Sequence, residues 1–273
     1  ASVRACHAGG RPARFRALMA LPTWSLRPLR SVRACGRVLG LLWHVLQGLW
    51  LVTWRFPRYS PAQQQAQVQA WSLGLLARAG VRLQVQGEAV LQGPVLLAAN
   101  HLSWLDIPVL HAARYCRFIS KSDVQAWPIV GTLATAGGTL YIHRESRRDA
   151  LRMVHDMRQA LEEGQVLAIF PEGTTGDGRD LLPFHANLLQ APLLAGAPVQ
   201  PVGLRFVEAA TGAISYAPSY VGDETLLGSV WRTLSAPPLL AIVHFGALQT
   251  ADGRDRRAWS EDLHREVDRL RQS

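Results

Sequence analysis

The sequence predicts an α/β fold in which helices flank a mixed, largely parallel β-sheet, with an N-terminal appendage of two helices before it. From Gly80 onward, short apolar segments alternate with helical segments, which is the pattern of strands joined by crossover helices. Several of these apolar segments are uninterrupted, as in strands that are buried on both faces. The 273 residues, 48% of them hydrophobic, allow one large domain and an appendage.

Residues 1–33 are rich in Arg, Ala and Pro, and we expect them to form a basic, disordered tail. They do not have the order of a secretory signal, because arginines interrupt every apolar run. Twelve arginines and no acidic residue precede Glu88, whereas 17 basic and 20 acidic residues lie from Glu88 onward. This asymmetry indicates an anionic partner for the first part of the chain, either nucleic acid or an anionic membrane surface.

Residues 34–79 are predicted to form two membrane-associating helices. The first, from Cys35 to Trp54, approaches the length of a bilayer span, but three polar residues interrupt it, so a spanning and an interfacial helix both remain open. Its tryptophans suit the headgroup region and favour a membrane over nucleic acid. A buried helix of the globular domain is the alternative, which the arginines leading into the segment disfavour. The interrupting residues are Arg37, His44 and Gln47, the tryptophans are Trp43, Trp50 and Trp54, and the leading arginines are Arg27, Arg30, Arg33 and Arg37.

The second helix of the appendage is predicted from Pro61 to Ala79. Ser60 is a favourable N-cap, Pro61 fits the first helical position, and Gly80 ends the helix.

The three cysteines, Cys6, Cys35 and Cys116, are odd in number and widely spaced. They match neither a disulfide framework nor a set of zinc ligands. This usage favours a reducing, cytosolic setting.

Residues 80–273 are predicted to form the α/β domain, without internal repeats. The predicted strands are 81–86, 94–100, 116–121, 138–144, 165–170, 198–206 and 237–246, and the predicted helices are 147–163, 187–195 and 255–272.

Polar residues follow four of the predicted strands at their carboxyl ends. Ligands of open α/β sheets gather beyond this edge, so we expect these residues to line one site. They are His101 and Asp106 after the first buried strand, Lys121 and Arg144 after the next two, and Glu172, Gly173 and Thr174 after 165–170.

His101 and Asp106 have two interpretations that can both hold. Ser103 and Asp106 match the spacing of a capping box, which would make Asp106 structural and start a helix there, with Pro108 in its first turn. A histidine at a strand exit with a nearby carboxylate is also the arrangement of a general base whose ring is oriented by an acid.

Lys121 is the only lysine among the 29 cationic side chains, which favours a role for it, although a surface residue is the alternative. Arg144 is equally compatible with a simple ion pair on the surface.

Four segments resemble the motif blocks of the lysophosphatidic acid acyltransferase family of glycerolipid acyltransferases. They occur in the family order and at compatible spacing, and the resemblance covers roughly residues 81–206. The segments are NHLSWLD, similar to the block Asn-His-x-Ser-x-x-Asp; GTLYIHR, similar to Gly-x-x-Phe-Ile-x-Arg; FPEGT; and APVQPVGL, similar to the fourth, proline-containing block.

The resemblance implies that His101 is the catalytic base and Asp106 its partner, and that Arg144, Glu172 and Gly173 hold the polar head of a lysolipid acceptor. A lipid hydroxyl needs its proton removed as it attacks an acyl thioester, and no activated Ser or Cys is evident, so direct transfer is the economical mechanism. The implied co-substrate is acyl-CoA or an acyl carrier protein, with no cofactor and no metal. The implied location is the cytoplasmic face of the inner membrane.

The acceptor is expected to be lysophosphatidate, with a lyso-ornithine lipid as a close alternative. Many relatives follow FPEGT with Arg-Ser, whereas this chain has Thr175 and Asp177 in FPEGTTGDG, which looks similar to the block of bacterial lyso-ornithine lipid acyltransferases. Asp177 would repel a phosphate and suit an ammonium group, or it could simply bind backbone amides in a turn.

Three other functions are less consistent with the sequence. A metal-dependent hydrolase would need a second histidine at ligand spacing from His101, which is missing. A non-catalytic membrane-binding protein would not need the pair His101 and Asp106. Nucleic-acid binding depends only on the basic tail, and we expect no nucleic-acid partner.

Overall fold

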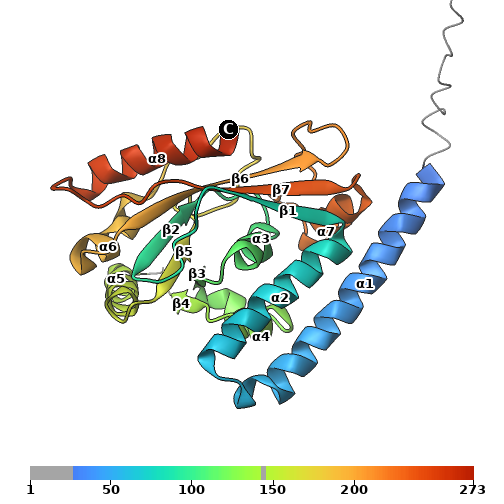
Figure 1. Ribbon diagram of the computed structural model, residues 1–273, viewed down its shortest axis with the longest axis horizontal. Helices are drawn as coiled ribbons and strands as arrows, with labels where there is room; N and C mark the ends of the chain where they lie inside the picture. The colour runs from blue at the N-terminus through green and yellow to red at the C-terminus, as the bar shows by residue number, and fades with distance from the viewer. Residues whose placement is uncertain (1–26, 143–145) are drawn as a thin grey trace, which may run out of the picture.

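The computed structural model describes residues 27–142 and 146–273 (Figure 1). Its centre is a seven-stranded sheet in the order β1-β7-β6-β2-β5-β3-β4, in which every neighbouring pair is parallel except β6 and β7. The predicted α/β class with a mixed, largely parallel sheet is confirmed. The strands are β1 (Val81–Gln86), β2 (Val95–Ala99), β3 (Arg117–Lys121), β4 (Leu140–Ile142), β5 (Val166–Ile169), β6 (Val199–Glu208) and β7 (Leu239–Phe245).

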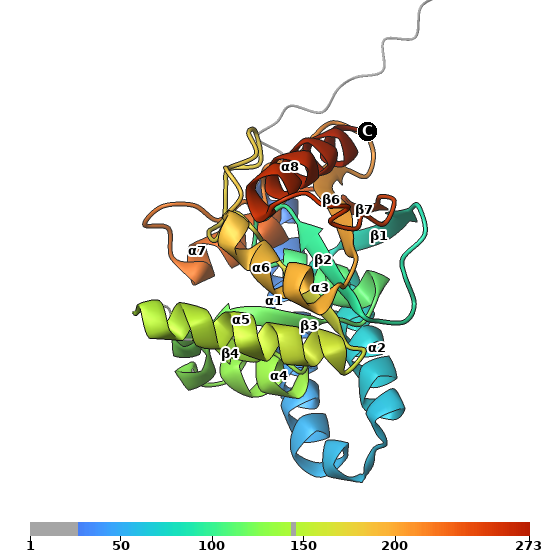
Figure 2. The same ribbon diagram turned by 90° about the vertical axis from the view of Figure 1, so that its left-hand side faces the viewer.

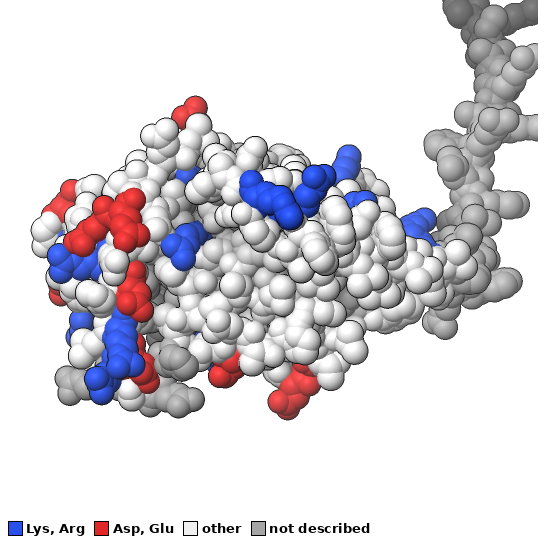
Figure 3. Space-filling view, turned by 90° about the horizontal axis from the view of Figure 1, so that it is seen from below, with Lys and Arg blue, Asp and Glu red and all other residues white. Residues whose placement is uncertain are grey.

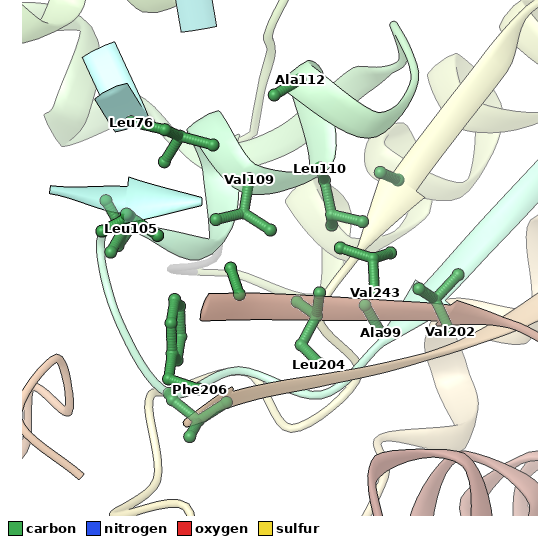
Figure 4. Close-up of a cluster of buried hydrophobic side chains, with 14 of the residues drawn as sticks. Leu76, Ala99, Leu105, Val109, Leu110, Ala112, Val202, Leu204, Phe206 and Val243 are labelled. Carbon is green, nitrogen blue, oxygen red and sulfur yellow. The ribbon is translucent and has the colours of Figure 1, made fainter. Parts of the chain in front are cut away.

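Helices cover both faces of the sheet (Figures 1 and 2). On one face α2, α3 and α7 enclose a core that Figure 4 shows between α3, β6 and β7. On the other face α5, α6 and α8 enclose a second core around Met157 and Trp259. Successive residues of β2 enter the two cores in turn, as the period of a strand requires. The helices are α1 (Arg27–Trp54), α2 (Pro61–Ala79), α3 (Asp106–Ala113), α4 (Val130–Ala136), α5 (Arg147–Glu162), α6 (Gln190–Ala195), α7 (Leu226–Ser235) and α8 (Arg256–Gln272), with short 3-10 helices η2 (Phe56–Arg58), η3 (Ser122–Ala126) and η4 (Ala186–Leu189).

The two helices predicted as an appendage, α1 and α2, form a helical hairpin, but α2 belongs to the main core because Leu75, Leu76 and Ala79 are buried in it. Helix α1 begins at Arg27, so residues 27–33 belong to it and not to the predicted tail, whereas residues 1–26 lie outside the described residues. Helix α2 has the predicted bounds: the Ser60 hydroxyl accepts a hydrogen bond from the Gln63 amide, and Gly80 ends the helix in the left-handed region at φ +75°.

Small residues let the two hairpin helices interlock. The His44 ring stacks on Trp71 at 5.0 Å between centroids, and its Nε2 lies 2.8 Å from the Trp71 carbonyl oxygen. A Cβ atom on Gly48 would lie 2.6 Å from the Trp71 indole nitrogen, and one on Gly74 would lie 2.8 Å from His44 Cε1. One of the expected interruptions of the apolar helix, His44, is thus explained by packing, because His44 faces α2.

One of the four arginines that lead into the apolar segment, Arg37, binds the protein, although we interpreted these arginines as evidence against a helix packed on the domain. The Arg37 guanidinium donates hydrogen bonds to the carbonyl oxygens of Leu234 at 2.8 Å and Ala236 at 2.9 Å, at the carboxyl end of α7. These carbonyls have no partner within the helix, and a cation stabilises that end. Arg37 therefore ties α1 to the α/β domain.

Candidate active site

The segment between β2 and α3 begins at a fixed point. The buried side chain of Asn100 donates to the carbonyl oxygen of Leu204 at 3.0 Å and accepts from its amide at 2.7 Å, which joins the end of β2 to β6. The chain then leaves the sheet and enters α3 at Asp106. Both ends of this short connection are held, so His101 is presented from a rigid segment.

His101 and Asp106 form a hydrogen-bonded pair. His101 Nδ1 lies 2.8 Å from Asp106 Oδ2, and the side chains are 17% and 0% exposed. The same carboxylate oxygen accepts hydrogen bonds from the backbone amides of Leu102 at 2.7 Å and Ser103 at 2.8 Å. Three donors converge on Oδ2 and offset part of the cost of burying the charge, whereas the buried Oδ1 accepts no hydrogen bond from the described residues.

The capping box is only half formed. The Asp106 carboxylate binds the Ser103 amide, but the Ser103 hydroxyl accepts from Leu105, and α3 begins at Asp106 without a side-chain cap. Pro108 lies in the first turn, as expected. The reason for the difference is that Asp106 turns back toward His101, so its carboxylate serves the loop and the imidazole together.

This geometry suits a general base. The Asp106 carboxylate can only accept a hydrogen bond, so Nδ1 of the neutral His101 ring must carry the proton. The other nitrogen, Nε2, then keeps the lone pair that can take a proton. When His101 becomes an imidazolium, the buried carboxylate 2.8 Å away stabilises it.

Glu172 holds the loop that follows β5 against the His101 segment. Its Oε1 accepts from the His101 amide at 2.6 Å and its Oε2 from the Leu182 amide at 2.9 Å, while the Gly176 amide donates to the His101 carbonyl oxygen at 2.8 Å. Burial raises the pKa of Glu172, and the two amides oppose this rise. Glu172 thus positions the backbone of His101, and direct contact with an acceptor stays a prediction.

Three other predicted site residues, Lys121, Gly173 and Thr174, lie near the same edge. Lys121 ends β3 and is exposed, and since β5 separates β3 from β2, it is about 10 Å from the strand that carries His101. Gly173 adopts φ +71°, a conformation that favours glycine, and Thr174 is exposed in the same loop. Arg144 lies outside the described residues.

Asp177 binds a backbone amide in a turn, which is the simpler of its two interpretations. Its Oδ1 accepts from the Arg179 amide at 2.9 Å, and its Oδ2 lies 3.9 Å from the Arg179 guanidinium. The negative charge therefore has a cation beside it, which weakens the expectation that Asp177 repels a phosphate. The neighbouring Thr175 hydroxyl donates to the Tyr220 carbonyl oxygen.

Two residues of the site were not predicted. The Phe170 ring stacks on the His101 imidazole at 3.8 Å between centroids, and Asn100 fixes the strand exit. The signal for Phe170 was its place two residues after buried Ala168, which turns it to the same face of the sheet. Among residues 27–142 and 146–273, no three His, Cys, Asp or Glu side chains gather to hold a metal ion.

Residues 82–205 match the family model described as Acyltransferase. The chain is 38% identical over 212 residues to a lyso-ornithine lipid O-acyltransferase of Pseudomonas aeruginosa, covering 76% of this chain and 80% of that protein. It is 36% identical over 210 residues to a 1-acyl-sn-glycerol-3-phosphate acyltransferase of Neisseria gonorrhoeae, covering 76% and 81%. The fold is similar to the crystal structure of the 1-acyl-sn-glycerophosphate acyltransferase of Thermotoga maritima, with a TM-score of 0.65, 17% identity, and coverage of 88% and 97%.

Proposed function

Because the chain belongs to the acyltransferase family and is an O-acyltransferase, we propose that it transfers a fatty acyl group from an acyl thioester to the hydroxyl of lysophosphatidate in membrane lipid synthesis. The observation that supports the chemistry is the pair His101 and Asp106, in which one nitrogen of the ring is held by a buried carboxylate and the other is left to act on substrate.

In this reaction Nε2 of His101 takes the proton of the acceptor hydroxyl while the oxygen attacks the thioester carbonyl carbon. The tetrahedral oxyanion collapses, the carbon–sulfur bond breaks, and the proton passes from the imidazolium to the leaving thiolate. The products are the acylated lipid and a free thiol, and His101 returns to its neutral form. Asp106 keeps its charge throughout and stabilises the imidazolium between the two proton transfers.

Direct transfer is supported by the surroundings of three described side chains that could otherwise act as nucleophiles and form an acyl-enzyme. Ser103 is fully buried and its hydroxyl accepts from the Leu105 amide. Burial raises the pKa of the Cys116 thiol to about 12, which keeps it protonated, and Cys35 lies on the outer part of α1. A nucleophile would need a base beside it or a lowered pKa.

The donor is acyl-CoA or an acyl carrier protein thioester, either of which supplies its own leaving group. A lyso-ornithine lipid is the second candidate acceptor. The observation that favours it is the segment FPEGTTGDG, which places Thr175 where many relatives have Arg, together with the 38% identity to an enzyme named for that acceptor.

A competition between the two lysolipids tests the acceptor. We expect the purified protein, given equal amounts of both, to acylate lysophosphatidate faster, because exposed Lys121 offers a cation at the site edge. Thr175→Arg should increase this preference by about tenfold, since a charged hydrogen bond to phosphate is added. Thr175→Val is the matched control, because it removes the hydrogen bond to Tyr220 and adds no charge. Faster acylation of the lyso-ornithine lipid by the unmodified protein would refute the first choice.

We further propose that the protein lies on the cytoplasmic face of the inner membrane, with α1 in the interface. Residues Ser31–Trp54 are long and apolar enough to cross a bilayer by length and composition. However, α1 packs on α2, α7 and α4, and this contact with the domain supports a helix that lies on the membrane. Five of its exposed apolar residues recur every three or four positions and so share one face: Leu39, Trp43, Leu46, Trp50 and Trp54.

The residues around this apolar face of α1 support the same placement on the membrane. Figure 3 shows a largely uncharged face on which the acidic side chains lie at the edge, while a group of Lys and Arg side chains lies inside the outline. The loop before α4 adds exposed Trp127 and Ile129. Arg55 and Arg58 follow this apolar face at the hairpin turn, where they can meet lipid phosphates.

Vesicle sedimentation tests the membrane contact. We expect Trp50→Ser combined with Trp54→Ser to lower binding to anionic vesicles at least tenfold. The reason is that burial of each exposed indole in the interface contributes about 1.5–3 kcal/mol to the free energy of binding. Point substitutions are preferable to removing α1, since Arg37 and His44 pack it onto the protein. Leu151→Ser is the control, because Leu151 is exposed on α5. Unchanged binding of the double variant would contradict the placement of α1.

A further inference from the structure

The catalytic imidazole is the outer end of a stack of four aromatic rings that continues into the core. The His101 ring lies on Phe170 at 3.8 Å between centroids and 7° between planes. Phe170 lies on Phe118 at 5.6 Å and 19°, and Phe118 lies on His111 at 5.0 Å and 21°. The first contact is the closest and the most parallel of the three.

The sheet explains why these rings align. Strands β2, β5 and β3 are neighbours, and Phe118 is in register with Ala168, two residues before Phe170. Phe118 and Phe170 therefore face the same side of the sheet, where His111 of α3 packs on Phe118. Phe118 is 3% exposed and His111 is 7% exposed, so the inner half of the stack cannot shift without disturbing the core.

The stack presents one charge, at its outer end. Burial lowers the pKa of His111 to about 4, so the inner imidazole is neutral at neutral pH. Only His101 changes charge during turnover, when it accepts the proton of the acceptor. At that moment a cation lies flat on the face of Phe170, whose π electrons attract it.

We infer that Phe170 is a positioning residue that acts through His101: its ring, backed by Phe118 and His111, fixes the plane of the catalytic imidazole and stabilises the imidazolium formed in the transition state. The contribution is selective, because the attraction is strong for the charged ring and weak for the neutral ring of the resting enzyme. Asp106 stabilises the imidazolium from its edge, and Phe170 stabilises it from its face. This inference depends on His101 being the base of the proposed reaction.

The test separates the charge effect from packing. Phenylalanine analogues with one, two and three fluorine atoms are placed at position 170, which keeps the shape nearly constant and progressively removes the negative face of the ring. We expect kcat to fall stepwise by about fivefold to thirtyfold in total, the range of a desolvated cation–π contact, with KM and Tm unchanged. The same series at Phe206, a buried core residue outside the stack, is the control and should leave kcat constant.

A second readout does not require activity. The pH at which the His101 ring takes up a proton, followed by NMR, should move stepwise to lower pH in the position-170 series. Constant kcat and a constant NMR midpoint across that series, or an equal fall of kcat in the Phe206 series, would overturn the inference. If the unmodified protein transferred no acyl group to any lysolipid while the NMR midpoint still moved, the proposed function would fail and the ring contact would stand.

Discussion

Replacing His101 with alanine will reduce kcat for acyl transfer by about 10²–10⁴-fold, the usual worth of a general base. The imidazole makes its contribution only when the acceptor proton leaves, so KM for the lysolipid should change little. The rate is measured as acylated lipid formed per minute with purified protein at saturating lysolipid.

The protein should remain folded, because the His101 side chain is partly exposed and its backbone bonds to Glu172 and Gly176 do not need the ring. Circular dichroism and thermal unfolding check this. His155→Ala is the matched control, since His155 is exposed on α5 and should leave turnover unchanged. Turnover of His101→Ala within about threefold of the unmodified protein would exclude His101 as the base.

Replacing Asp106 with asparagine will lower kcat by about 10²-fold or more, because an amide lacks the charge that stabilises the imidazolium and can hold the ring in the wrong tautomer. The variant also weakens two hydrogen bonds from backbone amides, those of Leu102 and Ser103. Unfolding free energy should therefore fall by about 1–3 kcal/mol, as hydrogen bonds to a charged group are replaced by neutral ones.

The two effects of Asp106→Asn separate its two roles. Activity is compared at a temperature well below the unfolding midpoint of the variant, so that loss of folded protein does not enter kcat. Asp156→Asn, on the exposed face of α5, is the control for removing a carboxylate. A lower unfolding midpoint with unchanged kcat would mean that Asp106 only holds the loop, which was the structural interpretation of the capping-box pattern.

The sheet could be predicted because its strands carry their own signals. The apolar run of β2 and the alternation in β1 are local patterns, and each strand was placed within a few residues of its observed bounds. The sequence patterns do not predict helices α4 and α7. Helix α4 is short, and α7 presents Leu227 and Trp231 to solvent, so apolar spacing alone did not reveal its buried face.

The pair His101 and Asp106 was predictable because both residues lie within seven positions of the end of β2. The roles of Glu172, Phe170 and Arg37 were not, since each depends on a partner that is distant in sequence. Glu172 binds the amide of a residue 71 positions away, and Arg37 binds a carbonyl 197 positions away. A sequence pattern shows which residues leave a strand, but tertiary packing decides which of them touch substrate and which support others.

The most direct test of acyl transfer by His101 follows both products of the proposed reaction at once. Purified protein is given acyl-CoA and lysophosphatidate, and mass spectrometry measures phosphatidate while a thiol reagent measures free CoA. We expect that both form in equal amounts, and that His101→Ala makes neither above background. Release of CoA together with free fatty acid in place of phosphatidate, or equal phosphatidate from His101→Ala, would contradict transfer of the acyl group to the lysolipid by this histidine.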